Sequence, residues 1–371
     1  MDKKRILVAM SGGVDSSVAA ALLKEQGHDV AGATIRTWAS GQCADRNTKA
    51  CCGISGVEDA REVAGSIGIP YWVFNFEDDF KKYVVDHFAS EYQKGRTPNP
   101  CISCNEHIKF RLFLEKGRQL GYDFIATGHY AQVHEDPDTG KYYLSEGVDA
   151  GKDQSYVLFP LEQNLLKQLF LPVGQFTKSE IREQARKLNL SCVMNKPDSQ
   201  EICFIPSNDY GAFLEREYMK HAKPGIIRTK EGKVLGEHPG YFHFTKGQRR
   251  GLGVAFSERL YVVETIPETN EVIVGTKEDV LGETFEVRRM NWFLKPNVSN
   301  FNAQIKIRSQ HTKAQAQVEM LSDSSIHATF LEPQDAITPG QGAVLYDGPR
   351  VLGGGWIETV IGTCSAGARF K

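Results

Sequence analysis

The sequence predicts an α/β protein that begins with a Rossmann-like domain over residues 1–206 and continues into two smaller, β-rich domains. Three observations predict this fold class. Apolar strand-like segments alternate with helix-like segments through residues 1–205, and a glycine-rich loop directly follows the first strand-like segment. From about residue 225 the sequence pattern changes to short β-like runs. Strand–helix alternation is typical of a parallel sheet covered by helices on both faces.

The elements of the first domain can be assigned in chain order. Gly27 follows the first expected helix, Gly68 closes the second, and Thr177 is a candidate N-cap for the last one. Expected strands cover residues 5–10, 29–34, 69–76 and 123–127, and expected helices cover residues 16–26, 57–68, 80–94, 105–120 and 178–188.

The rest of the chain carries turn signals rather than helical periodicity. Turn-forming pairs lie at residues 231–232, 239–240, 339–340 and 347–348, and helical periodicity is nearly absent after Met219. We therefore expect a small central domain over residues 207–280 and a C-terminal antiparallel β-barrel over residues 281–371.

Composition places the chain among ordinary globular proteins. Its 371 residues are 41% apolar and 24% charged, close to globular averages, which excludes disorder, collagen and coiled coil as the main architecture. The 44 basic and 46 acidic residues nearly balance. Any RNA-binding surface must therefore be a local patch.

Two further features suggest a compartment. No apolar run approaches the ~18–20 residues that span a bilayer, and the start MDKKRILVAMSGG lacks the pattern of a signal peptide. We expect a soluble, cytoplasmic protein with no membrane contact. Its eight cysteines are too few for a disulfide scaffold of this size, so clustered cysteines in a reducing cytosol indicate catalysis or metal binding.

The loop at residues 11–17, SGGVDSS, is the strongest local motif. Its glycines let backbone N–H groups turn toward an anion, and the helix that follows adds the positive end of its dipole. A Walker A loop would carry a lysine after its last glycine, and this loop has none. The loop is therefore suited to gripping released pyrophosphate, with Asp15 as a candidate magnesium ligand. The alternative is a plain glycine turn with serine caps.

This loop resembles the signature of the PP-loop ATP pyrophosphatases, which adenylate a carbonyl oxygen. Further motifs narrow the resemblance to the bacterial tRNA-specific 2-thiouridylase family, over essentially the whole chain. These motifs are GRTPNPCISCNEHIKF (95–110), ATGHYA (126–131), KDQSYVLF (152–159), KPDSQEICF (196–204), FTKGQRRGLG (244–253) and PGQGAVLYDG (339–348).

The resemblance implies ATP-dependent 2-thiolation of the wobble uridine of tRNA. The C2 oxygen would be adenylated, and sulfur would then arrive from a protein persulfide with release of AMP. Implied cofactors are ATP and Mg²⁺. Implied partners are tRNAs for lysine, glutamate and glutamine, and a sulfur donor such as a cysteine desulfurase or a sulfur-relay protein. Implied ATP-binding residues are Ala9, Met10, Ser11, Gly12, Gly13, Val14, Asp15, Ser16, Ile35 and Gly128, with Asp15 also counted as catalytic.

Two cysteines lie in matched motifs. Cys104 opens an expected helix, whose dipole would favour the thiolate, and by resemblance it is the nucleophile. Cys203 matches the family's persulfide carrier. The alternative is that both are ordinary buried cysteines. Other cysteines lie in no matched motif: we interpret Cys192 and Cys364 as structural thiols, and Cys43, Cys51 and Cys52 as thiols of a polar loop or a small zinc or redox site.

Cys101 departs from the commoner family pattern, in which we expect an aspartate. It forms a Cys-x-x-Cys with Cys104. Together with Cys203, these thiols are candidate ligands of an iron–sulfur cluster that passes sulfur. The alternative is a spare thiol, and a disulfide mechanism would use only Cys104 and Cys203.

By resemblance, further residues contact the target base or the tRNA. His129 lies at the carboxyl edge of the expected sheet, where doubly wound folds bind ligands, although it could instead be a buried structural histidine. Residues 152–154 are expected to contact tRNA, and Asp153 would help to deprotonate or polarise the uracil. The alternative is that these residues form a solvated loop. The full set is Asn99, Pro100, Cys101, His129, Lys152, Asp153, Gln154, Arg308, Ser309 and Gln341.

A basic segment covers residues 223–259. It holds eight Lys or Arg and three Asp or Glu, with aromatic residues at 241, 242 and 244. This composition is expected for phosphate and stacking contacts with RNA, or else for an ordinary charged surface.

Three other functions compete with tRNA 2-thiolation. The first is an iron–sulfur-dependent thiolase of the same superfamily. The second is an amide-forming PP-loop ligase similar to GMP synthetase, which needs neither redox-active thiols nor a barrel. The third is a tRNA-binding or metal-sensing protein that uses ATP only structurally. ATP–pyrophosphate exchange that depends on tRNA distinguishes them.

Overall fold

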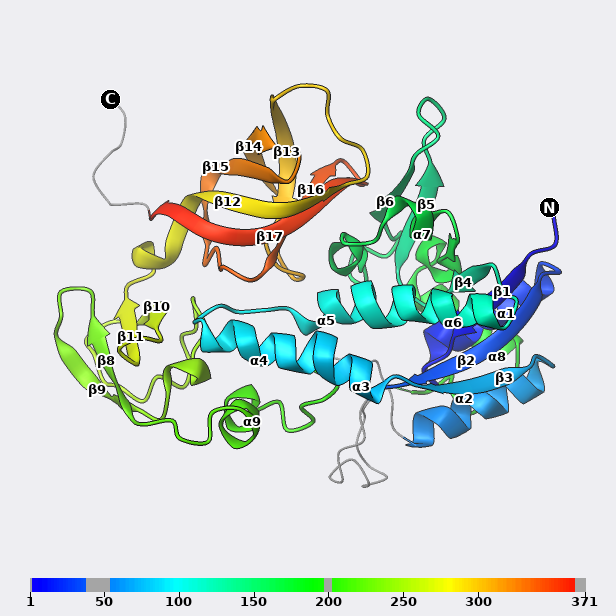
Figure 1. Ribbon diagram of the computed structural model, residues 1–371, viewed down its shortest axis with the longest axis horizontal. Helices are drawn as coiled ribbons and strands as arrows, with labels where there is room; N and C mark the ends of the chain where they lie inside the picture. The colour runs from blue at the N-terminus through cyan, green and yellow to red at the C-terminus, as the bar shows by residue number, and fades with distance from the viewer. Residues whose placement is uncertain (1, 38–53, 197–201, 364–371) are drawn as a thin grey trace. The chain divides into compact units, whose positions relative to one another are not determined.

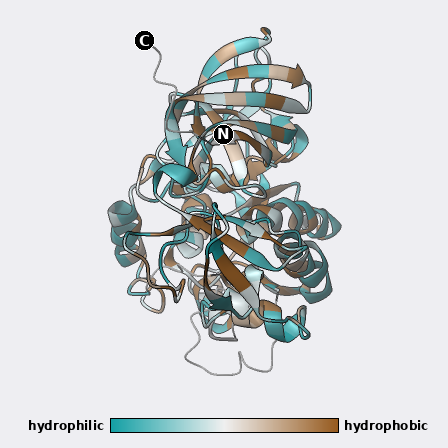
Figure 2. Ribbon diagram, turned by 90° about the vertical axis from the view of Figure 1, so that its left-hand side faces the viewer, coloured by the Kyte–Doolittle hydropathy of each residue, from teal (hydrophilic) through white to brown (hydrophobic). Residues whose placement is uncertain are grey.

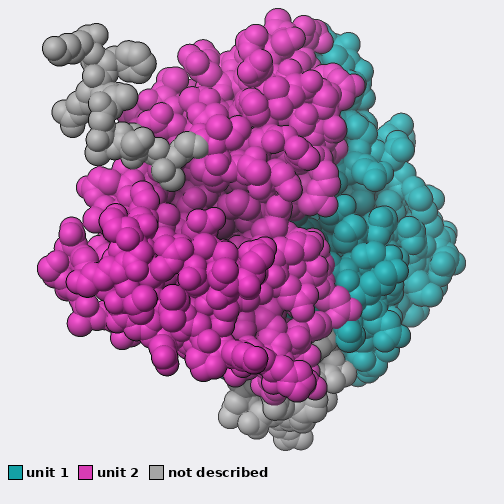
Figure 3. All heavy atoms as spheres, turned by 60° about the vertical axis from the view of Figure 1, so that its left-hand side comes forward, with its two compact units in different colours: residues 1–85, 100–208, 349–352 teal, residues 86–99, 209–348, 353–371 magenta. Residues whose placement is uncertain are grey.

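A computed structural model describes residues 2–37, 54–196 and 202–363 of the chain (Figure 1). Cys43, Cys51, Cys52 and Cys364 lie outside the described residues. The chain divides into two compact units, coloured separately in Figure 3. Unit 1 comprises residues 1–85, 100–208 and 349–352, and unit 2 comprises residues 86–99, 209–348 and 353–371.

Unit 1 is built on a parallel sheet, as the sequence predicts. Its strands lie in the order β3 (Tyr71–Asn75), β2 (Asp29–Arg36), β1 (Arg5–Ala9), β4 (Phe124–Ala126) and β7 (Leu169–Phe170). Each neighbouring pair runs parallel. The carboxyl ends of β1, β2 and β4 therefore meet at one edge, where the phosphate loop begins.

Helices cover both faces of this sheet. On one face, α1 (Val14–Glu25), α2 (Ile54–Ser66) and α8 (Lys178–Lys187) share a buried core with β1, to which they contribute Val18, Val63 and Ile181. On the other face lies α6 (Phe113–Gln119), where a side chain at Gly117 would contact Leu7 of β1 and Ile125 of β4. Burial of these apolar side chains is the main stabilising term of the unit.

The helix that carries Cys104 begins earlier than the sequence analysis expects. It consists of α5 (Pro100–Ser103), the wider π-helical η2 (Cys104–Leu112) and α6. The expected start at residue 105 is therefore wrong. Proline is favoured at the first helical position because its φ is already helical and it has no N–H to satisfy. Cys104 consequently lies in the second turn, where the helix dipole acts less strongly than in the first.

The preceding helical segment crosses the boundary between the units. It consists of α3 (Glu77–Phe80), the π-helical η1 (Lys81–Val85) and α4 (Asp86–Gln93), and α4 belongs to unit 2. The expected helix at residues 80–94 is confirmed in its main part.

Unit 1 also contains an antiparallel hairpin that the sequence analysis did not assign. The strands β5 (Ala131–Glu135) and β6 (Tyr142–Glu146) pair directly, and Ser145 of β6 pairs with Arg350. Short helical turns complete the unit: η3 (Ser155–Leu158), α7 (Gln163–Leu166) and η4 (Pro172–Gln175).

The first part of unit 2 is a small sheet beside α9 (Tyr210–Glu217). Its strand order is β10 (Tyr261–Ile266), β11 (Glu271–Gly275), β8 (Gly225–Thr229) and β9 (Val234–His238). Ile227, Val262, Val272 and Val274 form its core, together with Phe244 from the basic segment. Two short turns follow the strands, η5 (Tyr241–His243) and η6 (Glu278–Val280).

The second part of unit 2 is the expected antiparallel barrel. Within the described chain, its strands follow the order β12 (Leu281–Trp292), β15 (Ser325–Asp335), β14 (Ala314–Ser322), β13 (Asn300–Lys306), β16 (Gly342–Asp347) and β17 (Arg350–Thr363). Pairing of β12 with β17 closes the ring. Figure 2 shows hydrophobic and hydrophilic residues alternating along these strands, as expected when one side of each strand faces the barrel interior.

Across the described residues, we find no helix long and apolar enough to span a membrane.

Candidate active site and RNA-contact residues

The phosphate loop lies between β1 and α1, and its own hydroxyl groups hold it in shape. Ser16 Oγ accepts a hydrogen bond from Ser11 N at 3.1 Å and donates to the Gly13 carbonyl at 3.2 Å. Ser17 Oγ donates to the same carbonyl at 2.9 Å. No side chain caps the N-terminus of α1, whose N-cap residue is Gly13. The first amides of α1 are thus open to an anion, as in helix-terminal phosphate sites.

Two glycines bring backbone segments close to this loop. Gly12 has φ +72° and lies so close to α2 that a Cβ would be 2.3 Å from the Gly56 carbonyl oxygen. Gly128 follows β4, and a Cβ there would lie 2.6 Å from Ser16 N. The structure therefore brings Gly128 against the start of α1, beside the other predicted ATP-binding residues.

The strands behind the loop are fixed by a short hydrogen-bond chain. Tyr71 donates its hydroxyl to Thr34 Oγ1 at 2.6 Å, and Thr34 Oγ1 donates to the Met10 carbonyl at 2.6 Å. Ile35 follows Thr34 on β2 and is buried. The expected ATP-binding positions at residues 9, 10 and 35 thus lie on adjacent strands at the edge that carries the loop.

Replacing Gly128 with alanine is expected to weaken ATP binding at least tenfold, because the new methyl group would overlap the backbone at the start of α1. Isothermal titration with ATP would measure the change. Gly65→Ala is the matched control, because a Cβ at Gly65 in α2 meets nothing within 4 Å. Equal ATP affinity of the Gly128→Ala variant and the wild type would remove Gly128 from the site.

Asp15 is held by two residues that the sequence analysis did not assign. Lys178 Nζ lies 2.8 Å from both carboxylate oxygens, and the Tyr130 hydroxyl donates to Oδ1 at 2.7 Å. Lys178 is the first residue of α8, directly after the N-cap Thr177, and it is only 9% exposed. Hydrogen bonds to a charged group in a partly dry site are stronger than exposed ones. Asp15 is therefore fixed in position beside the phosphate loop.

Lys178 supplies an ammonium group beside a loop that lacks its own lysine. A signal for it exists in the sequence, because a lysine in the first turn of a helix opposes the helix dipole. Such a residue is expected to have an anionic partner elsewhere. The partner is Asp15, 163 positions away in the chain, so local sequence patterns could not identify it.

A second lysine reaches the loop from the segment that leads to Cys203. Lys196 Nζ donates to the Gly12 carbonyl at 3.1 Å and forms an ion pair with Asp59 of α2. The same segment is held to α8 by Arg182, which donates to the carbonyl groups of Met194 and Lys196. The phosphate loop and the start of the cysteine-bearing segment are therefore joined directly.

The segments that carry the two candidate sulfur-handling cysteines, Cys104 and Cys203, both pack against the helical stretch α3–η1. Cys104 begins η2 and is buried, and η2 contacts α3 and η1. Phe204, the neighbour of Cys203, packs edge-on against Phe80 of α3 with ring centroids 5.7 Å apart. Cys203 is partly exposed, and both residues are thiols in this structure.

The three candidate cluster ligands, Cys101, Cys104 and Cys203, do not form a metal-binding group in the part of the chain that the structure describes. Cys101 is exposed whereas Cys104 is buried. Within residues 2–37, 54–196 and 202–363, no three His, Cys, Asp or Glu side chains gather closely enough to hold a metal ion.

His129 is buried rather than open to a ligand. Its Nδ1 lies 2.7 Å from Thr127 Oγ1, and its ring lies 5.4 Å from that of Phe110. Burial lowers the pKa of His129 well below its usual range, so the imidazole is neutral at physiological pH. This burial matches the alternative of a structural histidine, and contact of His129 with the target base stays a prediction.

The predicted triplet at residues 152–154 is a folded loop. Asp153 accepts hydrogen bonds from the backbone of Gly147 and from the backbone and hydroxyl of Ser155. Gln154 exchanges bonds with the backbone of Tyr130, at 2.9 Å through Oε1 and 2.8 Å through its own N–H. Asp153 is therefore used to position the loop, and the loop in turn positions Tyr130, which holds Asp15.

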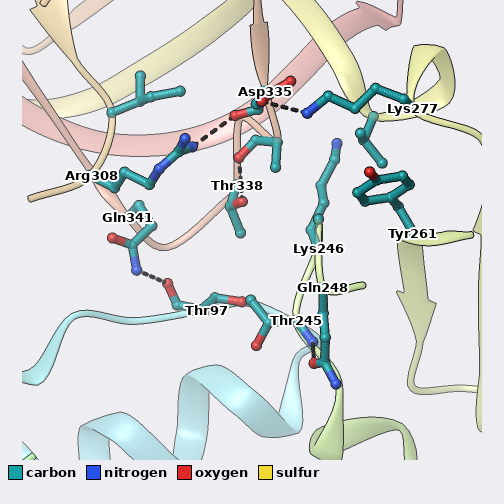
Figure 4. A pocket seen from close by; sticks show the side chains of 14 residues that line it. Thr97, Thr245, Lys246, Gln248, Tyr261, Lys277, Arg308, Asp335, Thr338 and Gln341 are labelled. Carbon is teal, nitrogen blue, oxygen red and sulfur yellow. Dashed lines mark hydrogen bonds and ion pairs between the residues drawn. The ribbon is translucent and has the colours of Figure 1, made fainter. Parts of the chain in front are cut away.

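Arg308 and Gln341, two of the predicted tRNA-contact residues, line one cavity of unit 2 (Figure 4). Arg308 donates to the Asp335 carbonyl at 2.8 Å, and Gln341 donates to the Thr97 carbonyl at 2.8 Å. Thr97 precedes Asn99 by two positions, so Gln341 anchors the chain just before the predicted base-contacting residues Asn99, Pro100 and Cys101. Ser309 is half-buried beside Arg308.

Arg249 and Arg250 are exposed in the basic segment. Replacing both with alanine is expected to weaken tRNA binding and to reduce the slope of log K against log salt by about 2, because each phosphate contact contributes about 0.9. Filter binding between 50 and 300 mM salt would measure it. Arg288→Ala is the control, since Arg288 is an exposed arginine paired with Glu286 on the barrel. A slope equal to that of wild type would reduce this segment to an ordinary charged surface.

A parallel sheet that carries a lysine-free phosphate loop at the carboxyl end of β1 defines a nucleotide-binding α/β protein of the PP-loop class. Family models match the chain in three consecutive segments: the tRNA methyl transferase HUP domain over residues 4–207, the tRNA methyl transferase PRC-barrel domain over residues 211–276, and the aminomethyltransferase β-barrel domain over residues 282–357.

Curated relatives match nearly the full length. The tRNA-specific 2-thiouridylase MnmA of Carboxydothermus hydrogenoformans is 48% identical over 358 residues, covering 96% of this chain and 98% of the relative. The MnmA protein of Geobacter metallireducens is 46% identical over 362 residues, covering 97% and 98%. Among solved structures, a 4-thiouridine synthetase–RNA complex with bound ATP aligns with 57% of this chain and 50% of its own, at 16% identity and a TM-score of 0.36. The chain belongs to the tRNA-specific 2-thiouridylase family.

Proposed function

We propose that this protein is an ATP-dependent tRNA uridine 2-sulfurtransferase that acts on the wobble uridine. The observation that carries the proposal is the lysine-free phosphate loop with Asp15 fixed by Lys178, in a chain related over nearly its full length to tRNA-specific 2-thiouridylases. The reaction must replace a poor leaving group, a carbonyl oxygen, with sulfur. ATP makes that oxygen a leaving group by adenylation.

In the first step, the uridine C2 oxygen attacks the α-phosphorus of ATP, and pyrophosphate leaves. The open amides at the start of α1 and the hydroxyl groups of the loop bind the phosphate oxygens. Lys178 and Lys196 add positive charge from outside the loop, each now held by a carboxylate, Asp15 and Asp59. Fixed donors of this kind stabilise the charge that develops on pyrophosphate.

Asp15 fits a magnesium site in which one protein carboxylate binds the ion. A carboxylate offers about four lone-pair positions, and Lys178 and Tyr130 occupy three of them. One position remains for a metal. Mg²⁺ commonly takes one or two protein carboxylates and completes its shell with water and substrate phosphates. It would supply charge neutralisation of the polyphosphate.

In the second step, sulfur replaces the activated oxygen. The terminal sulfur of a persulfide on Cys203 would be released to C2, and AMP would leave with the original oxygen. The Cys104 thiolate would attack the inner sulfur of Cys203, which forms a disulfide between the two cysteines and frees the terminal sulfur with its electron pair. An external reductant, two thiols or one dithiol, then restores both cysteines and is itself oxidised to a disulfide. Attachment of both cysteines to the α3–η1–η2 helices supports this pairing.

The direct test is tRNA-dependent turnover. Purified protein, ATP, unmodified tRNA and a cysteine desulfurase with cysteine should release pyrophosphate and AMP and form 2-thiouridine, identified by mass spectrometry of digested tRNA. Pyrophosphate release that proceeds equally well without tRNA would contradict base adenylation. ATP binding with neither release nor thiolation, in the presence of tRNA and donor, would favour a structural role for ATP.

A further inference from the structure

The loop at residues 147–154 reaches Asp15 through Tyr130. A Cβ at Gly147 would lie 2.9 Å from the Tyr130 carbonyl oxygen, so the start of the loop packs against the Tyr130 backbone. Gln154, at the end of the loop, bonds to the same backbone. The loop therefore encloses the residue whose hydroxyl group donates to the Asp15 carboxylate.

The same loop reaches the other partner of Asp15, Lys178, through Asp149. Asp149 Oδ2 accepts a hydrogen bond from the backbone N–H of Lys178 at 2.9 Å. Lys178 is thus held at both ends, its backbone by Asp149 and its ammonium group by Asp15. Two carboxylates from distant parts of the chain therefore determine where this side chain lies.

The capping box of α8 leaves the Lys178 amide to Asp149. Thr177 N donates to Glu180 Oε2 at 2.7 Å, and Glu180 N donates to Thr177 Oγ1 at 3.3 Å. These two bonds satisfy the amides at the N-cap and at the third helical position. The amide of Lys178, at the first helical position, has no carbonyl partner within the helix. Asp149 supplies the acceptor, and its negative charge also interacts favourably with the helix dipole.

Asp149 is itself fixed by its own loop. Its Oδ1 accepts from Gly151 N at 3.0 Å and its carbonyl oxygen accepts from Lys152 N at 2.9 Å, which closes a tight turn. Immediately before it, Val148 N donates to the carbonyl oxygen of Gly174 at 2.9 Å, in the turn η4 that precedes α8. The acceptor is therefore held in place by surrounding hydrogen bonds, as a supporting residue of a functional site must be.

We propose that Asp149 is a positioning residue for the adenylation step: it fixes the first turn of α8 so that the Lys178 ammonium group stays on Asp15 beside the phosphate loop. The inference rests on the proposed function for the reaction that it serves. The alternative is a helix cap that adds stability and nothing more. The two roles differ because a cap acts on the whole helix, whereas a positioning residue acts through one side chain.

Asp149→Ala tests the positioning role in the reaction. It is expected to slow tRNA-dependent pyrophosphate release about tenfold, the effect of losing one hydrogen bond to a charged group. Asp149→Asn should stay within about threefold of wild type, because asparagine keeps an acceptor and caps helices about as well as aspartate. In a Lys178→Met background, Asp149→Ala should slow the reaction no further, because its effect passes through Lys178. An equal loss in that background would overturn the proposal.

Acetylation of Lys178 reports the position of its side chain without any turnover. In the free enzyme, Asp149→Ala is expected to raise the acetylation rate of Lys178 about fivefold, measured by peptide mass spectrometry, because the first turn of α8 loses a cap. The rate at the exposed Lys187 of the same helix should not change. Asp136→Ala is the matched control, since Asp136 accepts from Thr139 N at 2.9 Å in the turn of the β5–β6 hairpin. It should leave both rates and pyrophosphate release at wild-type values.

Thermal unfolding shows which variants are folded at the assay temperature. Asp149→Glu keeps the negative charge at the helix start but displaces its oxygens, and it is expected to have the same two effects if the alanine variant does not fold. Wild-type pyrophosphate release together with wild-type acetylation of Lys178 in the folded variant would overturn the inference and leave the proposed function standing. Absence of tRNA-dependent pyrophosphate release from the wild-type protein would instead contradict the proposed function, and the acetylation rates would still decide whether Asp149 positions Lys178.

Discussion

Lys178→Met is expected to reduce tRNA-dependent pyrophosphate release by at least 100-fold, and Asp15→Asn by a similar factor. Lys178 lies 2.8 Å from both oxygens of Asp15, at a phosphate loop that has no lysine of its own. Loss of one preorganised charged group in a partly buried site commonly costs 10²–10³ in rate. Since the two residues act as one unit, the double variant should be little slower than either single variant.

Stability must be measured beside the rate. Removal of one partner leaves the other charge partly buried and uncompensated, which destabilises the fold. Thermal unfolding of each variant would show whether the protein remains folded at the assay temperature. Lys187→Met, on the exposed side of α8, is the matched control, because Lys187 pairs with the exposed Glu183 of the same helix rather than with Asp15. Near-normal pyrophosphate release by folded Lys178→Met would remove this pair from catalysis.

Cys203→Ser and Cys104→Ser are expected to abolish thiolation at different steps. Cys203→Ser should take up no sulfur from a desulfurase, because the persulfide carrier is missing, while tRNA-dependent pyrophosphate release continues. Cys104→Ser should accumulate a persulfide on Cys203 and form no 2-thiouridine, because the thiol that releases the sulfur is missing. Labelled sulfur, followed by non-reducing gels and mass spectrometry, separates the two outcomes.

Cys192→Ser is the control for both cysteine variants. Burial raises the pKa of the Cys192 thiol, which makes it a poor nucleophile, and the residue packs beside the core of unit 1. Its replacement should leave sulfur uptake and thiolation unchanged. Thiolation by Cys203→Ser at the wild-type rate would show that another residue carries the sulfur.

Much of the first unit could be predicted from local patterns. The order of strands and helices and the loop at residues 11–17 follow from apolar runs, glycines and caps, and the structure confirms the parallel sheet. The barrel was predictable as a class from its turn pairs. These features depend on residues close together in the chain, which is what sequence periodicity reports.

Other features depend on distant residues and could not be predicted in this way. The hairpin β5–β6 is an exception, because its connection Asp-Pro-Asp-Thr-Gly at residues 136–140 is a local turn signal that the sequence analysis did not use. The early start of the Cys104 helix follows from Pro100, which the sequence analysis treated only as part of a base-contacting motif. Tyr130, Lys178 and Lys196 reach the phosphate loop from 115, 163 and 184 positions away. Their roles come from the fold, because each is locally an ordinary tyrosine or lysine.

The path of the chain between its two units limits how the protein can be divided. The chain changes unit after residues 85, 99, 208, 348 and 352, so neither unit is one continuous segment. α4 is encoded inside the first half of the gene but packs with α9: Tyr92 lies against Tyr210, and Tyr218 donates to Asp86. A fragment ending near residue 208 would keep α4 and lose these partners, so it would expose apolar surface and aggregate. Splitting such a gene for complementation, or trading its second unit for that of a relative, requires exchanging residues 86–99 as well.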